Sequence, residues 1–79
     1  MIQYVLKAIM NMPKTPKEIE RIILKDGWKL SRNSKGSHRQ YNHPYKKGTV
    51  TIAFHNKDIP IKTLKNICKQ AQIDWRNYL

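Results

Sequence analysis

His38 is the residue of this sequence best placed to do chemistry, because basic residues surround it and a turn precedes it. It lies within residues 34–41 (SKGSHRQY), at the start of a segment that alternates like a strand. Histidine is the only side chain whose unperturbed pKa lets it take up or release a proton near neutral pH. Lys35 and Arg39 bring positive charge that would hold an anionic group beside the imidazole. This pattern favours proton transfer on a phosphodiester.

The turn before His38 also suits a phosphate. Gly36 permits an unusual backbone conformation and a close approach of the phosphate. Ser37 and the turn amides can donate hydrogen bonds to phosphate oxygens, and Lys35 adds charge. The three histidines and Cys68 do not have zinc-motif spacing, and the sequence has neither a P-loop lysine nor paired carboxylates suited to two-metal hydrolysis. We therefore expect no metal and no other cofactor.

The other two histidines are expected to differ in role. His43 comes two positions after Tyr41, on the strand face opposite His38, so we expect it to pack or to cap the chain at Pro44. His55 follows the third predicted strand. It would approach the site as a second proton-transfer group or as a phosphate ligand, or it would be merely structural, and the sequence leaves these alternatives open.

The charge balance indicates an anionic partner. The 79 residues include 16 Lys and Arg against five Asp and Glu, which gives a net charge of +11 and a pI near 10.1. Such a surface attracts polyanions, so nucleic acid is the expected partner. A membrane surface would need one long basic amphipathic segment, whereas the lysines here are spread along the chain. We expect one small domain and no membrane partner.

The sequence also indicates the compartment. A single cysteine, Cys68, excludes an internal disulfide and fits a reducing environment. Residues 1–12 lack the features of a signal peptide and are too few to span a bilayer. We therefore expect a cytoplasmic protein.

A helix is predicted over residues 16–26. Thr15 is placed to cap its free amides, Pro16 suits the first helical position, and Glu18 completes a capping box. Gly27 offers the left-handed conformation that commonly ends a helix.

Three strands and a second helix follow. Alternating residues predict strands over 28–32, 37–42 and 49–54, and an apolar stripe predicts a helix from Pro60 to Ala71. The fold class is α+β, in the order α-β-β-β-α, with a three-stranded antiparallel sheet and both helices on one face. The predicted core contains Ile19, Ile22, Ile23, Leu30, Val50, Ile52, Phe54, Leu64, Ile67 and Cys68. Trp28 is expected in the core or at its rim.

Several short motifs follow one another in a specific order. They are Asp26-Gly27-Trp28, Lys35-Gly36-Ser37-His38, Tyr41, His43-Pro44, Val50-Thr51-Ile52 with His55 after it, and Thr63-Leu64 through Ile67 to Lys69-Gln70-Ala71. In this order and spacing they resemble the HicA family of bacterial toxins, which are small mRNA interferases. The resemblance covers roughly residues 12–73, most of the chain.

The resemblance implies a fold like that of a double-stranded-RNA-binding domain and a catalytic role for His38. It implies mRNA as the substrate and a HicB-type antitoxin as the partner protein. Residues 12–79 would form the toxin domain, and residues 1–11 an N-terminal extension without an assigned role. The family commonly has a glycine where this chain has Gln72, so the second helix is expected to end differently or to continue.

Two functions are compatible with the sequence. In the first, an endoribonuclease uses His38 as general base or acid, while Lys35, Gly36, Ser37, Arg39 and His55 bind RNA. In the second, a non-catalytic RNA-binding module of the same fold recognises RNA by shape and phosphate contacts. Such modules commonly carry a lysine cluster where the last helix begins, and residues 58–62 (DIPIK) do not provide one. The enzyme is therefore favoured.

Overall fold

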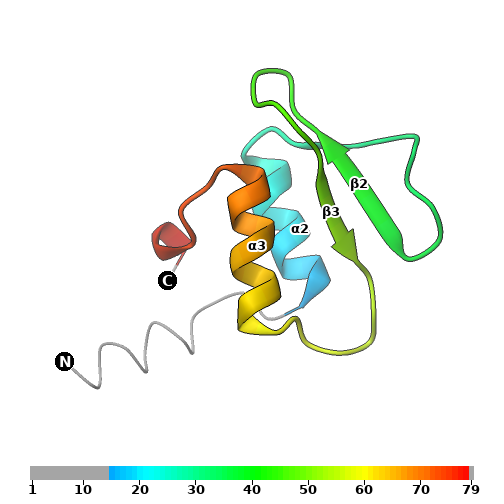
Figure 1. Ribbon diagram of the computed structural model, residues 1–79, viewed down its shortest axis with the longest axis vertical. Helices are drawn as coiled ribbons and strands as arrows, with labels where there is room; N and C mark the ends of the chain where they lie inside the picture. Colours follow the sequence, from blue (N-terminus) through cyan, green and yellow to red (C-terminus); the bar gives the residue numbers. More distant parts are fainter. Residues whose placement is uncertain (1–14, 79) are drawn as a thin grey trace.

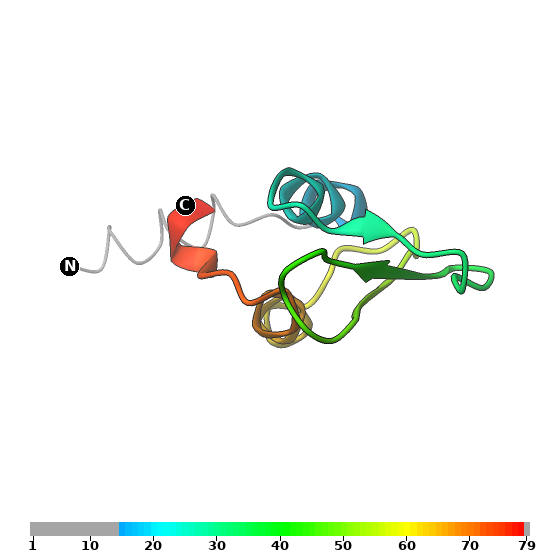
Figure 2. The ribbon, with the colours of Figure 1, turned by 90° about the horizontal axis from the view of Figure 1, so that it is seen from above.

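The computed structural model describes residues 15–78 of the chain. Its elements are α2 (Pro16–Lys25), β1 (Lys29–Leu30), β2 (His38–Asn42), β3 (Val50–Ala53), α3 (Ile61–Ala71) and the short 3₁₀ helix η1 (Trp75–Tyr78). The strands form one antiparallel sheet in the order β1-β2-β3. The two helices lie beside each other on one side of it (Figures 1 and 2). The predicted α-β-β-β-α fold is confirmed, while the predicted extension 1–11 lies outside the described residues.

The register of β2 and β3 decides which side chains face the helices. Tyr41 pairs with Val50, Arg39 with Ile52, and His38 with Ala53. Directly opposed residues of antiparallel strands share a face, and Tyr41, Val50 and Ile52 are fully buried. His38 alternates with these residues and therefore lies on the outer face, away from the helices.

Helix α2 begins and ends as its sequence predicts. Thr15 Oγ1 accepts a hydrogen bond from the Glu18 amide (3.1 Å), and Thr15 Oγ1 donates to Glu18 Oε1 (3.0 Å). At the other end Gly27 has φ +106°. The amides of Gly27 and Trp28 donate to the carbonyls of Leu24 and Ile23 (both 3.1 Å), the Schellman arrangement of a glycine-terminated helix.

Helix α3 ends where a glycine would normally stand. Gln72 takes the left-handed conformation, with φ 55° and ψ 43°, which costs a non-glycine residue about 1–2 kcal/mol. Its side chain offsets part of this cost, because Gln72 Nε2 donates to the Lys47 carbonyl (2.9 Å). The helix therefore stops after Ala71 without a glycine.

The core lies between the helices and the sheet. Its buried members are Ile19, Ile23, Trp28, Tyr41, Val50, Ile52, Leu64, Ile67, Cys68 and Ala71, with Ile22 and Phe54 partly buried against them. Burial raises the pKa of the Cys68 thiol. Trp28 is anchored at the far end of α3, since its Nε1 donates to the Ala71 carbonyl (3.2 Å).

The prediction was wrong for Leu30, whose side chain is exposed (55%) instead of buried. The predicted strand over 28–32 is also shorter, with Lys29–Leu30 as its only ladder residues. The helices pack mainly against β3, so the edge strand β1 has no helix to cover Leu30. Beyond it a serine side chain interrupts the ladder, because Ser34 Oγ accepts from the Gln40 amide (2.9 Å) and donates to the Ser31 carbonyl (2.9 Å).

None of the helices in the described part of the chain is long and apolar enough to cross a membrane.

Candidate active site

A tight two-residue turn fixes His38 at the start of β2. The Lys35 amide donates to the His38 carbonyl (3.0 Å), and the His38 amide donates to the Lys35 carbonyl (2.9 Å). Gly36 and Ser37 form the loop between them, and Gly36 has φ +56° whereas Ser37 has a negative φ. This is the pattern of a type II′ hairpin turn, in which glycine takes the first central position. The turn sets both the position of the imidazole and the direction of the loop amides.

The side chain of His38 faces solvent on the outer face of the sheet. It lines a shallow depression together with Asn33, Lys35 and Gln40. Within residues 15–78 neither nitrogen of its imidazole makes a hydrogen bond. Both nitrogens are therefore available to a ligand.

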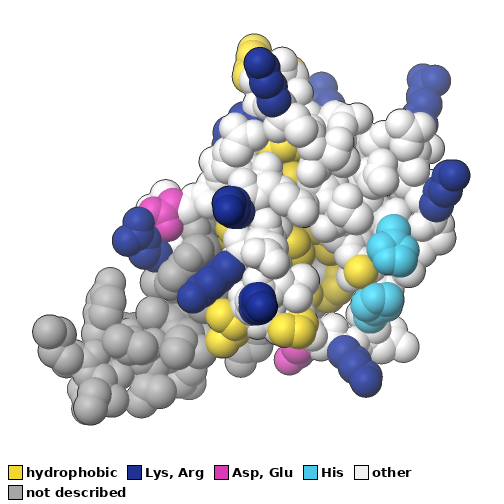
Figure 3. All heavy atoms as spheres, viewed as in Figure 1, with side chains coloured by type: hydrophobic (Ala, Val, Ile, Leu, Met, Phe, Trp, Pro, Cys, Tyr) yellow, Lys and Arg dark blue, Asp and Glu magenta, His cyan; other side chains and the backbone are white. Residues whose placement is uncertain are grey.

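A second exposed histidine, His55, lies beside His38. The two ring centroids are 6.4 Å apart and the ring planes are perpendicular, and Figure 3 shows two histidine side chains next to each other at this surface. The register explains the proximity, since His38 opposes Ala53 and His55 follows two residues later on the same face. One further backbone bond holds the strands together here, from the Phe54 amide to the Ser37 carbonyl (2.7 Å).

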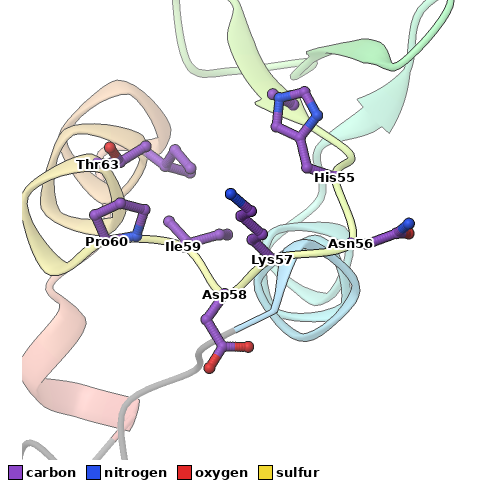
Figure 4. A pocket seen from close by; sticks show the side chains of 9 residues that line it. His55, Asn56, Lys57, Asp58, Ile59, Pro60 and Thr63 are labelled. Atoms are coloured by element: carbon purple, nitrogen blue, oxygen red, sulfur yellow. The ribbon is translucent and has the colours of Figure 1, made fainter.

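His55 lies where two depressions meet. One is lined by Thr15, Pro16, Lys17, Glu20, Arg39, Phe54 and His55. The other lies between the 55–60 loop and α3 and has Ala53, Ile59, Thr63 and Ile67 among its lining residues. Figure 4 shows Lys57 reaching into the second depression while the Asp58 carboxylate points away from it. Cationic groups therefore lie on both sides of His55.

Arg39 lies on the opposite face of β2 from His38. Its Nη1 donates to Glu20 Oε2 (3.0 Å), which raises the pKa of the guanidinium, and its Cζ lies 4.0 Å from the centre of the Phe54 ring. Glu20 Oε2 also accepts a hydrogen bond from the Tyr41 hydroxyl. Burial, together with this bond, raises the pKa of Tyr41.

A comparison with protein-family models matches residues 16–73 to the HicA toxin of bacterial toxin–antitoxin systems. The chain belongs to the HicA toxin family. Membership makes it a toxin of a toxin–antitoxin system, with an antitoxin as its partner. A comparison with curated proteins gives no match.

The HicA toxin brings most of its predicted site residues together. Lys35, Gly36, Ser37 and His38 form one turn, and His55 lies beside it. Arg39 follows His38 in the sequence, but its side chain lies on the opposite face of β2. It shares a depression with His55.

Sequence reasoning missed other lining residues of this toxin. Gln40 could have been found from its two-residue spacing to His38. Lys17 could not, because it comes from α2 and only the tertiary structure brings it near His55. Asn33 and Lys57 lie in loops, where no periodic pattern indicates which way a side chain points.

The third histidine of the toxin is part of the fold, as the sequence predicted. The side chain of His43 is 6% exposed. Its Nδ1 accepts hydrogen bonds from the amides of Tyr45 (3.0 Å) and Lys46 (3.1 Å). Its Nε2 therefore carries the hydrogen and donates to the Asp26 carbonyl (2.7 Å).

Within residues 15–78 the toxin has no group of three or more His, Cys, Asp or Glu side chains arranged to hold a metal ion.

Proposed function

We propose that this toxin is a metal-independent endoribonuclease that cleaves mRNA and so inhibits translation, with His38 as its general base or acid. The observation that carries the proposal is the state of His38. It is exposed, free of internal hydrogen bonds, and held by a tight turn whose residues suit a phosphate. A histidine that only stabilised the fold would instead have its nitrogens bonded, as His43 has.

The reaction class follows from these groups. The ribose 2′-hydroxyl attacks the adjacent phosphorus, and His38 transfers a proton in that step, which typically contributes about 10²–10⁴ in rate. Negative charge develops on the phosphoryl oxygens. The side chain of Lys35 and the exposed turn amides of Gly36 and Ser37 are available to stabilise this charge.

The charges around the site suit a single RNA strand. Lys35 lies on one side of the two histidines, and Lys17 and Arg39 line the depression on the other side of His55. Phosphates on either side of the cleaved bond would contact these cations. With mRNA as the substrate, the toxin acts in the cytoplasm.

The antitoxin partner would be of the HicB type and would cover the His38 face or present acidic residues to it. Complementary charge of this kind raises the association rate with a protein of net charge +11. Residues 12–79 would form the toxin domain, with residues 1–11 as an extension.

The test compares wild type with His38→Ala and His38→Gln. We expect both variants to lose RNA cleavage by roughly 10²–10⁴-fold and to lose growth arrest, at unchanged Tm and RNA affinity. Asn42→Ala is the matched control, because Asn42 is exposed on the same face of the same strand, and it should cleave like wild type. RNA binding should weaken with salt by a slope of about −0.7 per neutralised phosphate. A folded His38→Ala variant with full activity would refute the role of His38. Wild type that binds RNA without cleaving it would instead support the RNA-binding module.

A further inference from the structure

We propose that His55 is the second proton-transfer group of this site, so that His38 and His55 form an acid–base pair around a single phosphodiester. The proposal rests on the endoribonuclease function proposed above and goes beyond it by assigning the other half of the proton transfer.

The separation of the two imidazoles suits this arrangement. Each ring needs a hydrogen bond of about 2.6–3.2 Å to one of the two oxygens that enter and leave the same phosphorus. With ring centroids 6.4 Å apart, a phosphate that lies over the pair on its solvent side can be reached by one nitrogen of each ring, each at a different oxygen, and the two rings make no hydrogen bond to each other. The distance is set by the backbone, through the pairing of His38 with Ala53 and the bond from Phe54 to Ser37.

Lys35 shares the depression of His38 and is assigned to phosphate binding. The tyrosine and the carboxylates nearest to the two histidines are engaged or point away. Tyr41 is buried and its pKa is raised, so it does not release a proton near neutral pH. Glu20, the carboxylate in the depression beside His55, already accepts from Arg39 and Tyr41. Asp58 points away from the depression next to His55 (Figure 4). His55 is exposed, has no hydrogen bond within residues 15–78, and faces His38 directly.

The two histidines account for both proton transfers of the cleavage step. One neutral imidazole takes the proton of the 2′-hydroxyl as its oxygen forms a bond to phosphorus. The other imidazole, initially protonated, gives its proton to the 5′-oxygen as the bond between that oxygen and phosphorus breaks. The products are a 2′,3′-cyclic phosphate and a 5′-hydroxyl. The two histidines end with exchanged protonation states, which solvent resets.

The first experiment measures pH–rate profiles of wild type, His38→Ala and His55→Ala on a single-stranded RNA. An acid and a base produce a bell-shaped profile. We expect wild type to show the bell and each variant to lose one limb, a different limb in each, with kcat lowered roughly 10²–10⁴-fold. Asn42→Ala is again the control, since Asn42 is exposed on the same face of β2 as His38 and lines none of the three depressions described above. A His55→Ala variant with both limbs, or with only KM raised, would make His55 a phosphate ligand and overturn the pair.

The second experiment separates acid from base. In an RNA whose 5′-bridging oxygen is replaced by sulfur, the leaving group departs without a proton. Its cleavage should be restored in one of the two histidine variants and not in the other. Restoration in both or in neither would overturn the proposal. If His55→Ala lowers Tm, His55→Gln is measured in the same way.

The two proposals fail differently. Wild type that does not cleave RNA refutes the endoribonuclease itself. Wild type that cleaves, with His38→Ala inactive and His55→Ala fully active, refutes only the pair.

Discussion

Strand β2 begins with His38 and is followed directly by His43, and the two imidazoles meet opposite conditions. His43 is nearly buried, and both of its nitrogens bond backbone groups of Asp26, Tyr45 and Lys46. His38 is exposed and bonds nothing within the described chain. The same residue type therefore fixes the fold at one end of the strand and remains free for a ligand at the other.

Gly27, which lies against His43, and Gly36, in the turn before His38, differ in how much space surrounds them. A Cβ on Gly27 would lie 2.8 Å from His43 Nε2, whereas a Cβ on Gly36 would meet nothing within 4 Å. Lys46 further closes the His43 end, because its Nζ donates to Asp26 Oδ2 (2.6 Å) and to the carbonyls of Ala71 (3.2 Å) and Gln72 (3.0 Å). The imidazole at the His43 end is thus held by backbone groups, whereas both imidazoles at the His38 end remain available to a ligand.

The strongest test of this contrast is to remove His43. His43→Ala deletes three hydrogen bonds to the backbone and an aromatic contact with Trp28, so we expect the free energy of unfolding to fall by about 2–4 kcal/mol. Urea denaturation measures the loss. RNA cleavage per folded molecule should stay near wild type below the transition. If stability were unchanged while cleavage disappeared, the roles of the two ends would be reversed.

The glycines give a matched pair of smaller effects. In Gly27→Ala, the strain of the positive φ and the close contact of the new Cβ with His43 both destabilise the fold. We therefore expect the free energy of unfolding to fall by about 2–3 kcal/mol. Gly36→Ala carries only the cost of its φ, about 1 kcal/mol. Thermal melting of both variants checks the order. Equal losses would mean that His43 moves aside freely and that the closed end is not tightly packed.

The smallest effect concerns Tyr41 at high pH. The folded state raises the pKa of Tyr41 above its ordinary value of 10.0. Below pH 10.0 the hydroxyl keeps its proton in the folded and the unfolded state, so its contribution to the free energy of unfolding is fully present. Above pH 10.0 the unfolded chain loses this proton first, and the free energy of unfolding falls by at most about 1.4 kcal/mol per pH unit. Tyr41→Phe lacks this titration. Denaturation curves between pH 8 and pH 11 should show wild type losing stability faster than Tyr41→Phe, and parallel curves would contradict the prediction.

The sequence predicted the parts of the fold that local chemistry decides. The cap at Thr15, the glycine stop at Gly27 and the alternation around Tyr41 are all local, and each is confirmed. Leu30 was misplaced because its exposure depends on where the helices lie across the sheet, which a two-residue alternation does not report.

The candidate site also has a part that local sequence decides and a part that depends on how strands and helices pack. The turn that holds His38 is contiguous in sequence and was predicted. His55 was expected to approach this turn, with its role left open, whereas Lys17 was missed. The distance from His38 to His55 depends on the register of β2 and β3. The approach of Lys17 depends on the docking of α2.

All five acidic residues of the chain lie in its described part, and four of them are already bonded internally. Their partners are Thr15 for Glu18, Arg39 and Tyr41 for Glu20, Lys46 for Asp26, and Arg76 for Asp74. Few carboxylates are left to neutralise the remaining cations, so the folded molecule retains mutual repulsion among them. A polyanion that binds only the native state relieves this repulsion and stabilises it by RT ln(1 + [L]/Kd). An anionic ligand that binds the native state more tightly than the unfolded chain therefore also promotes folding.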